Sequence, residues 1–150
     1  MNIINLLNNR DELIISRFLE IWESSVKKTH AFLLDSDIVK IKPEVEQTLK
    51  YVKQLYGYCD CNGIFQGFIG TVEEKIEMLF IDVNSRGKGI GKFLLNFAVK
   101  NLGVKFVDVN EQNEQGVGFY KHLGFIEISR SEYDNEGRRF PLLHLEYITP

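Results

Sequence analysis

The chain of 150 residues is predicted to be an α/β protein of the α+β type, with a mixed, mostly antiparallel sheet of about seven strands and about four helices. Three observations predict this fold class. Short runs of apolar residues are joined by turn signals such as Asn62-Gly63. Longer segments repeat apolar residues at helical spacing. A strand, a glycine-rich loop and a helix follow one another between residues 78 and 95.

The N-terminal segment is predicted to contain one edge strand and one helix. Residues 3–6 are apolar enough for a short strand, and Asn9 or Asp11 is suited to cap the helix that follows. Apolar residues then recur at every fourth position, at Ile14, Phe18 and Trp22. This helix therefore turns one face toward the core.

A second helix is predicted to begin at Pro43, because proline is well tolerated in the first helical turn. Residues 29–41 before it are expected to be irregular. The apolar stripe of this helix is Val45, Leu49, Val52 and Tyr56. Gly57 is expected to end it.

The remaining segments predict strands and two further helices. Strands are expected at residues 58–60, 64–72, 75–83, 104–109, 125–133 and 140–148. The last two strands form a closing hairpin across residues 134–137. One helix follows the glycine-rich loop, and a short helix carries Tyr120.

Composition predicts a single domain over residues 1–150, with 44% hydrophobic and 26% charged residues. We expect a cytoplasmic protein, because no signal peptide or membrane-spanning run is evident. A net charge of −3 argues against a nucleic-acid partner. Cys59 and Cys61 are expected to be free thiols, and the three histidines show no spacing for a metal site.

The glycine-rich loop has the features of an anion site. Glycines at 87, 89 and 91 precede a helix whose first N–H groups have no intrahelical partners, and these can bind a pyrophosphate. A P-loop is excluded because Lys92 is followed by Phe93 and not by a hydroxyl residue. A dinucleotide fingerprint is excluded because its third glycine is missing.

The pattern that fits is Arg86-x-x-Gly89-x-Gly91, which resembles the acetyl-CoA pyrophosphate loop of the GNAT N-acetyltransferase family. A second segment strengthens this resemblance. The strand that ends at Val109 is followed by Asn113 and then by Tyr120 in the run Gly-Phe-Tyr-Lys-His-Leu-Gly-Phe, which resembles the second GNAT signature. The region around residues 22–33 also looks like that of small bacterial members assigned to peptidyl-lysine acetylation.

The resemblance implies a GNAT fold with a splayed central strand pair and a cofactor site for acetyl-CoA. The implied cofactor-binding residues are Phe80, Ile81, Val83, Arg86, Gly87, Lys88, Gly89, Ile90, Gly91, Lys92, Asn113 and Tyr120. Two positions depart from the family, which often has Pro where Val83 stands and Ala where Gly116 stands. No metal is implied.

The implied reaction is transfer of an acetyl group to a primary amine by direct attack. Tyr120 is the implied general acid for the departing sulfur. Glu77 is the candidate base, although a solvent-facing residue in alternation with Ile76 and Met78 would look the same. An ordered water is an alternative, and His30 is either a base or a cap for the neighbouring loop.

The acceptor is expected to be a small amine or a protein lysine, without a nucleic-acid or membrane partner. Trp22, Thr29 and His30 are the candidate substrate-binding residues, although Trp22 also fits the core stripe. Glu132, Asp134 and Glu136 could attract a cation if they face the pocket. The protein would be a monomer or homodimer. The alternative functions are an acetyl-CoA-binding sensor without transferase activity and, ranked last, an ATP-binding regulator.

Overall fold

The computed structural model describes residues 2–148; Met1 and residues 149–150 lie outside the described part. Seven strands form one sheet in the order β1-β2-β3-β4-β5-β7-β6. The strands are β1 (Ile3–Asn5), β2 (Gln54–Cys59), β3 (Phe65–Val72), β4 (Lys75–Ile81), β5 (Phe106–Asn110), β6 (Phe125–Ser131) and β7 (Leu142–Tyr147). The helices are α1 (Glu12–Thr29), α2 (Asp35–Tyr51), α3 (Ile90–Asn101) and α4 (Glu114–His122), with a 3-10 turn η1 (Val83–Ser85). The predicted fold class is confirmed.

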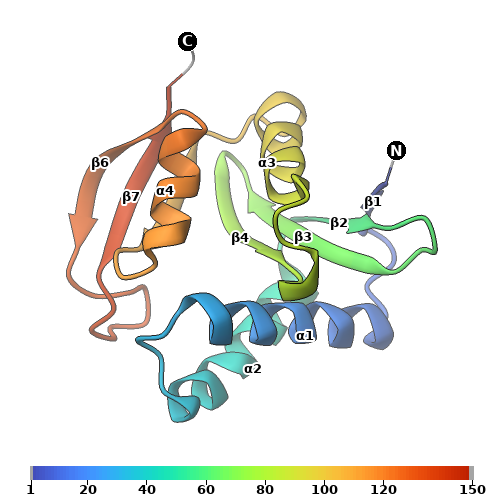
Figure 1. The fold of residues 1–150 in the computed structure, drawn as a ribbon, viewed down its shortest axis with the longest axis horizontal. Helices are drawn as coiled ribbons and strands as arrows, with labels where there is room; N and C mark the ends of the chain where they lie inside the picture. The colour runs from blue at the N-terminus through green and yellow to red at the C-terminus, as the bar shows by residue number, and fades with distance from the viewer. Residues whose placement is uncertain (1, 149–150) are drawn as a thin grey trace.

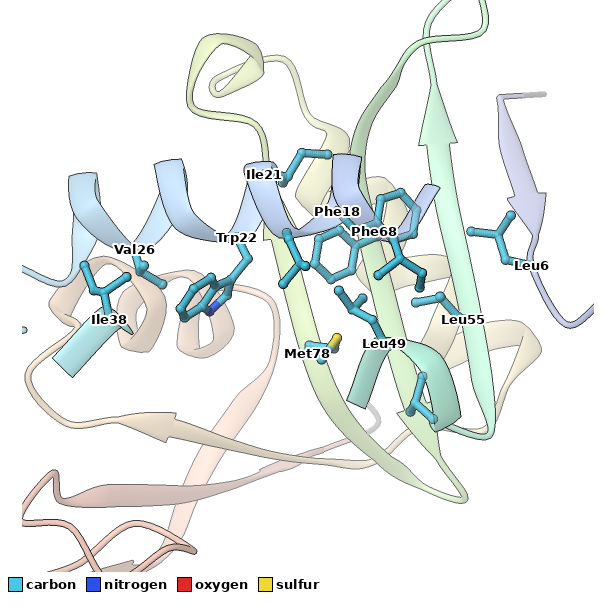
Figure 2. Packing of buried hydrophobic residues seen from close by; sticks show 13 residues of the cluster. Leu6, Phe18, Ile21, Trp22, Val26, Ile38, Leu49, Leu55, Phe68 and Met78 are labelled. Carbon is cyan, nitrogen blue, oxygen red and sulfur yellow. The ribbon is translucent and has the colours of Figure 1, made fainter. Parts of the chain in front are cut away.

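The helices lie on both faces of this sheet (Figure 1). Side chains of α1 and α2 pack with β3 and β4 in one hydrophobic cluster, which includes Phe18, Trp22 and Phe68 (Figure 2). The rings of Phe18 and Phe68 stack with centroids 4.6 Å apart. A second cluster joins α3 and α4 to the opposite face. Each large side chain buried in this way contributes about 1.5–3 kcal/mol.

The central strands β4 and β5 are parallel but pair at two positions only, Lys75 with Phe106 and Ile76 with Val107. Every other neighbouring pair in the sheet is antiparallel. Beyond Ile76 the two strands diverge, which is the splayed central pair that the family resemblance implied. The β6–β7 hairpin therefore stands apart from β4 in Figure 1.

A β-bulge at Glu77 interrupts the alternation of β4. Gly70 of β3 pairs with Met78, whereas the next residue, Thr71, pairs with Ile76, so Glu77 is the extra residue. Ile76 consequently packs in the cluster of α3, and Met78 packs in the cluster of α1. Glu77 is exposed, as the solvent-facing interpretation expects, but Ile76 and Met78 pack on opposite faces, so the alternation is interrupted.

The prediction of an irregular segment over residues 29–41 is correct for residues 30–34 only. Thr29 is the last residue of α1, and α2 begins at Asp35, so that Pro43 lies inside the helix. The Asp37 carboxylate accepts the Leu34 N–H at 2.9 Å, which caps the helix. The apolar stripe extends in the N-terminal direction across the proline through Ile38 and Ile41. This stripe outweighs the proline as a signal.

The predicted end of the second helix at Gly57 is also wrong. Helix α2 ends at Tyr51, and both Tyr56 and Gly57 belong to β2. A Cβ atom at position 57 would collide with the Phe65 ring and lie 3.0 Å from Phe18. Gly57 is therefore explained by close packing within the sheet.

The other predicted elements are present with boundaries shifted by a few residues. Asp11 is the N-cap of α1, and its carboxylate accepts the Ile14 N–H at 2.9 Å. Cys59 and Cys61 are free thiols, as predicted. Among residues 2–148, no helix combines the length and apolar character needed to cross a bilayer.

Candidate active site

A cleft of about 420 Å³ opens where β4 and β5 diverge, a volume typical of small-molecule sites. Its walls include β4, β5, the loop before α3, one side of α4 and the end of α1. The predicted site residues that line it are Thr29, His30, Glu77, Phe80, Ile81, Arg86, Gly87, Gly89, Ile90, Gly91, Lys92, Asn113 and Tyr120. The fold thus brings together residues from four separate segments of the chain.

The glycine loop leaves its backbone accessible at the mouth of this cleft. Gly87 and Gly89 have φ values of +79° and +82°, and a Cβ atom at either position would meet no atom within 4 Å. Gly89 is the N-cap of α3 and has no side chain to satisfy the first N–H groups of the helix. Gly91 differs, because a Cβ there would lie 3.4 Å from the Phe119 ring. Its role includes close packing of α3 on α4.

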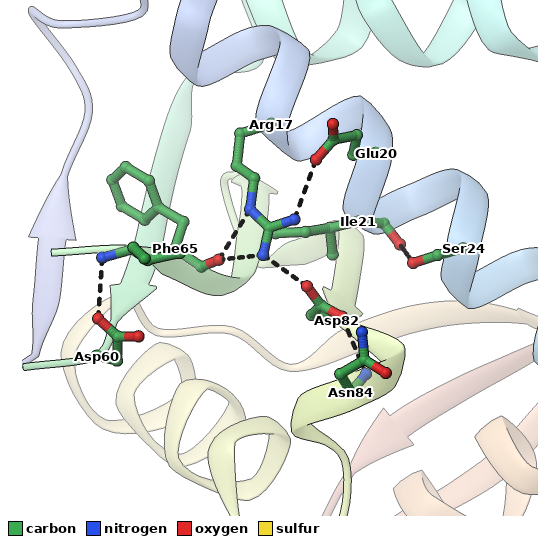
Figure 3. A network of polar contacts seen from close by, with 9 residues as sticks. Arg17, Glu20, Ile21, Ser24, Asp60, Phe65, Asp82 and Asn84 are labelled. Atoms are coloured by element: carbon green, nitrogen blue, oxygen red, sulfur yellow. Dashed lines mark hydrogen bonds and ion pairs between the residues drawn. The ribbon is translucent and has the colours of Figure 1, made fainter. Parts of the chain in front are cut away.

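The entry to the loop is anchored to α1 by Asp82 (Figure 3). Asp82 Oδ2 lies 2.5 Å from Arg17 Nη2, and the same nitrogen donates to the Phe65 carbonyl at 2.7 Å. The other carboxylate oxygen accepts the Asn84 N–H at 2.9 Å. Burial raises the pKa of Asp82, but the Asn84 and Arg17 hydrogen bonds outweigh it and the pKa is lowered overall. This anchor holds the entry to the loop against α1.

Tyr120 lies in the wall of the cleft between two aromatic rings. Its ring packs edge-on against Phe119 and Phe125, with centroid distances of 5.2 and 5.4 Å. Only 7% of the residue is exposed. Burial raises the pKa of the Tyr120 hydroxyl well above its ordinary value. The hydroxyl is therefore protonated at neutral pH, and the raised pKa means that it gives up its proton less readily than an exposed tyrosine does.

Asn113 caps α4 from within the cleft. Its Oδ1 accepts the Gly116 N–H at 3.1 Å. A Cβ atom at position 116 would collide with the Asn113 amide, so the alanine common in the family would displace this side chain. Two positions after Asn113, Gln115 Oε1 accepts a hydrogen bond from Arg86 Nη2 at 2.9 Å. These contacts fix the α4 side of the cleft.

Two carboxylates, Glu77 and Asp108, line the cleft from opposite sides of the splay. Glu77 is exposed at the bulge of β4. Asp108 of β5 lies 2.6 Å from Lys75 Nζ and 2.6 Å from His144 Nδ1. Burial raises the pKa of Asp108, but its bonds to Lys75 and His144 outweigh burial and lower the pKa overall. Asp108 therefore stays ionised beside the cleft.

His30 and Thr29 lie at the end of α1, facing the same cleft. Burial and the positive charge of Arg86 lower the pKa of His30 to about 4. The imidazole is therefore neutral at physiological pH. Thr29 Oγ1 lies 2.7 Å from His30 Nδ1.

Three predicted site residues lie elsewhere. Trp22 is 3% exposed in the cluster between α1 and α2, and it does not line the cleft. Val83 and Lys88 belong to the loop region but are also not among the residues that line the cleft. Their roles in binding stay predictions.

The acidic residues of the closing hairpin do not line the cleft either. Asp134 accepts the backbone N–H groups of Glu136 and Arg138 at 2.9 and 2.8 Å, which shapes the β6–β7 connection. Arg138 also pairs with Glu44 of α2. The suggestion that this hairpin places acidic groups at the cleft is therefore not supported; Glu77 and Asp108 supply them instead.

Comparison with known proteins identifies the family. The model of the GNAT acetyltransferase domain matches residues 40–144, which include the glycine loop, Asn113 and Tyr120. The chain belongs to the GNAT acetyltransferase family. This confirms the resemblance in the two motifs and makes the protein an acyltransferase.

Individual relatives agree with this assignment. The chain is 37% identical over 144 residues to the peptidyl-lysine N-acetyltransferase YjaB of Salmonella typhimurium, covering 96% of this chain and 98% of the relative. The solution structure of apo-YjaB from Escherichia coli matches with a TM-score of 0.87 and 32% identity, covering 99% of this chain and 97% of that one. The PaiA N-acetyltransferase of Thermoplasma acidophilum, solved with coenzyme A, matches with a TM-score of 0.69 and 20% identity, over 98% and 100% of the chains.

In this GNAT domain, the residues missed by sequence reasoning act through tertiary contacts. Arg17, Asp82, Asp108 and Gln115 are not among the residues that define the two motifs, and their partners are 29 to 65 positions away. Only the carboxylate that follows an apolar strand, at Asp82, gave a local signal. Within residues 2–148, no three or more His, Cys, Asp or Glu side chains are grouped to bind a metal ion.

Proposed function

We propose that this single-domain GNAT protein transfers the acetyl group of acetyl-CoA to the side-chain amine of a protein lysine. One observation carries the proposal: a single cleft joins the open glycine loop to Tyr120 and to two carboxylates. The lysine acceptor is favoured by the YjaB relatives, which are named peptidyl-lysine N-acetyltransferases. The exposed Glu77 also favours a cationic acceptor, whereas the charge of Asp108 is offset by Lys75.

The residues of the cleft suit an acetyl-CoA co-substrate. The unpaired N–H groups at the start of α3, together with Arg86, would bind the pyrophosphate. The diverging end of β4 has backbone groups near Phe80 and Ile81 that lack a partner on β5, and these would pair with the pantetheine amides. Bound acetyl-CoA supplies an activated thioester carbonyl.

Side chains of the protein would then remove and donate the protons of the reaction. A lysine amine arrives as an ammonium ion, and Glu77 would remove its first proton so that nitrogen can attack the carbonyl. A backbone N–H of the splayed strand would stabilise the developing oxyanion. Tyr120 would protonate the departing sulfur. The nitrogen must lose a second proton before the amide forms, so one proton is released overall for each acetyl group transferred.

A free-thiol assay of acetyl-CoA consumption tests the proposal. We expect turnover with lysine peptides exceeding that with polyamines, amino acids, aminoglycosides or arylamines. Preference for a small amine would keep the transferase and replace the acceptor. Coenzyme A binding in calorimetry without turnover on any amine would favour the alternative of a sensor. We place the reaction in the cytoplasm, carried out by a monomer or homodimer.

A further inference from the structure

Thr29 and His30 form a hydrogen-bonded pair whose proton positions follow from their partners. Thr29 Oγ1 lies 2.9 Å from the Ser25 carbonyl oxygen and 2.7 Å from His30 Nδ1. A carbonyl oxygen only accepts, so the single hydroxyl proton of Thr29 is donated to Ser25. Thr29 Oγ1 must then accept the Nδ1–H of His30. The contact therefore fixes one tautomer of the ring.

This tautomer gives His30 a free acceptor in the active-site cleft. With the proton on Nδ1, the neutral imidazole carries its lone pair on Nε2. The ring lines the cleft and lies beside Phe32, with ring centroids 5.3 Å apart. Nε2 is thus the ring nitrogen left to accept a proton from a ligand.

We propose that His30 Nε2 accepts the second proton of the attacking nitrogen, and that cofactor binding at Arg86 strengthens His30 as a base. This inference rests on the proposed acetyl transfer. After attack, the tetrahedral adduct holds a positively charged nitrogen that must lose a proton. The N–H bond breaks, its electron pair stays on nitrogen, and the proton forms a bond to His30 Nε2. His30 later releases this proton to solvent.

The basicity of His30 suits this second step. An N–H of the charged adduct is far more acidic than that of a free lysine ammonium, because the adduct carbon bears two further electronegative atoms. A weak neutral base is therefore sufficient. The first proton comes from the less acidic lysine ammonium, and its removal is left to Glu77.

Arg86 couples this base to the cofactor. Burial is the larger cause of the lowered pKa of His30. Of the charged side chains that line the cleft with it, Arg86, Lys92, Glu77 and Asp108, Arg86 is the one whose charge lowers that pKa further. A pyrophosphate bound at the glycine loop carries negative charge that offsets the Arg86 charge. His30 is consequently a poor base in the free enzyme and a better one when the acyl donor is present.

Nitrogen NMR of 15N-histidine-labelled protein tests this directly, because the chain has only three histidines. His30→Gln identifies the signal. We expect the His30 ring to be protonated at Nδ1 and neutral from pH 7 to about 5. Thr29→Val should allow the proton to occupy either ring nitrogen of His30, whereas Thr29→Ser should keep it on Nδ1. Coenzyme A should raise the midpoint of the His30 titration by more than about half a pH unit.

A matched variant isolates the coupling. Arg86→Gln should raise the His30 midpoint in the free protein and reduce the further shift caused by coenzyme A. An Nε2–H tautomer in the free protein, or a midpoint that coenzyme A leaves unchanged although calorimetry shows binding, would overturn the inference. Acetyl transfer measured on the same samples separates this inference from the proposed transfer to lysine. Active enzyme with either of these spectra would refute only the role of His30 as a base. Inactive enzyme with the expected spectra would instead contradict the proposed acetyl transfer to lysine.

Discussion

The ammonium of Lys75 lies 2.6 Å from Asp108 Oδ2, directly beyond the last backbone pair between β4 and β5. The contact continues across the sheet. Asp108 Oδ1 is 2.6 Å from His144 Nδ1, and His144 Nε2 is 2.6 Å from Ser131 Oγ. Four strands are thus joined by side chains at the point where the cleft opens. This series of side-chain contacts sets the spacing of β4 and β5 where the two strands no longer share backbone hydrogen bonds.

Replacing Asp108 by asparagine should weaken this connection. We expect the free energy of unfolding to fall by about 1–3 kcal/mol, because Lys75 loses its partner in a partly buried site. Since the pKa of Asp108 is lowered in the folded protein, its stabilisation is present above the ordinary carboxyl pKa and is lost as the pH falls below it. Urea unfolding at pH 7 and pH 3.5 measures both effects.

The control for this variant is Lys105→Met, which removes an exposed ion pair with Glu74 at 3.4 Å. Such surface pairs contribute about 0–1 kcal/mol. An equal loss of unfolding free energy in Lys105→Met and Asp108→Asn would mean that the side-chain contacts of Asp108 stabilise the fold no more than a surface ion pair does.

Gly89→Glu should abolish binding of coenzyme A. The new side chain would place a negative charge where the pyrophosphate is expected, and Gly89 has a φ value of +82° that disfavours any side chain. Gly103→Glu is the matched control, since Gly103 also has positive φ, +69°, and open space around it but does not line the cleft. Both variants should lose about 1–2 kcal/mol of stability through backbone strain.

Isothermal calorimetry separates the two glutamate variants. Gly103→Glu should bind coenzyme A as the wild type does. Unchanged affinity in folded Gly89→Glu would refute the assignment of the loop to the pyrophosphate.

Tyr120→Phe should lower kcat by about 10²- to 10⁴-fold with little change in coenzyme A affinity. Phenylalanine keeps the edge-on packing against Phe119 and Phe125 and removes only the proton donor. Tyr147→Phe, which alters a second tyrosine packed on Phe125, is the control. Steady-state kinetics measures kcat, and calorimetry measures the affinity for coenzyme A. A wild-type kcat in Tyr120→Phe would show that Tyr120 has only a structural role.

The strands, the glycine loop and the Tyr120 helix were predictable because their signals are local. Alternating apolar residues, turn dipeptides and the Arg86-x-x-Gly89-x-Gly91 spacing each act within a few positions of the chain. Helix α2 is predictable only in part, because Pro43 is a local signal for a helix start, whereas the stripe of Ile38 and Ile41 precedes it. Proline costs helix stability locally, but burial of the stripe outweighs that cost.

The details of the site depend on contacts that no local pattern encodes. The bulge at Glu77 arises from the register of β4 against β3, so an alternation rule assigns Ile76 to the wrong face. Asp108 gains its partners from β4 and β7, which are more than 30 positions away in the chain. Trp22 matched both a core stripe and a pocket, and its burial places it in the core.

Glu77→Gln should flatten the rise of kcat/KM with pH, because an amide cannot accept the proton of the amine. It should also raise KM for a cationic acceptor by removing a negative charge from the cleft. Glu127→Gln, an exposed glutamate on β6 outside the cleft, is the control. An unchanged pH profile with full activity in Glu77→Gln would exclude it as the base and leave an ordered water or His30.

His30 should make stability depend on pH above the range in which carboxylates titrate. Its pKa is lowered from 6.5 to about 4 on folding, so between these values the unfolded chain binds a proton that the folded protein does not. Stability must then fall as the pH falls through this window, by about 2 kcal/mol between pH 7 and pH 5. The acid losses from Asp82 and Asp108 come at lower pH, because both carboxyl pKa values are lowered. Urea unfolding at pH 7, 6 and 5 should therefore show a decline in the wild type and in His122→Gln, whose histidine is exposed, but a much weaker one in His30→Gln. The same slope in all three proteins would mean that His30 titrates as freely in the folded state as in the unfolded chain.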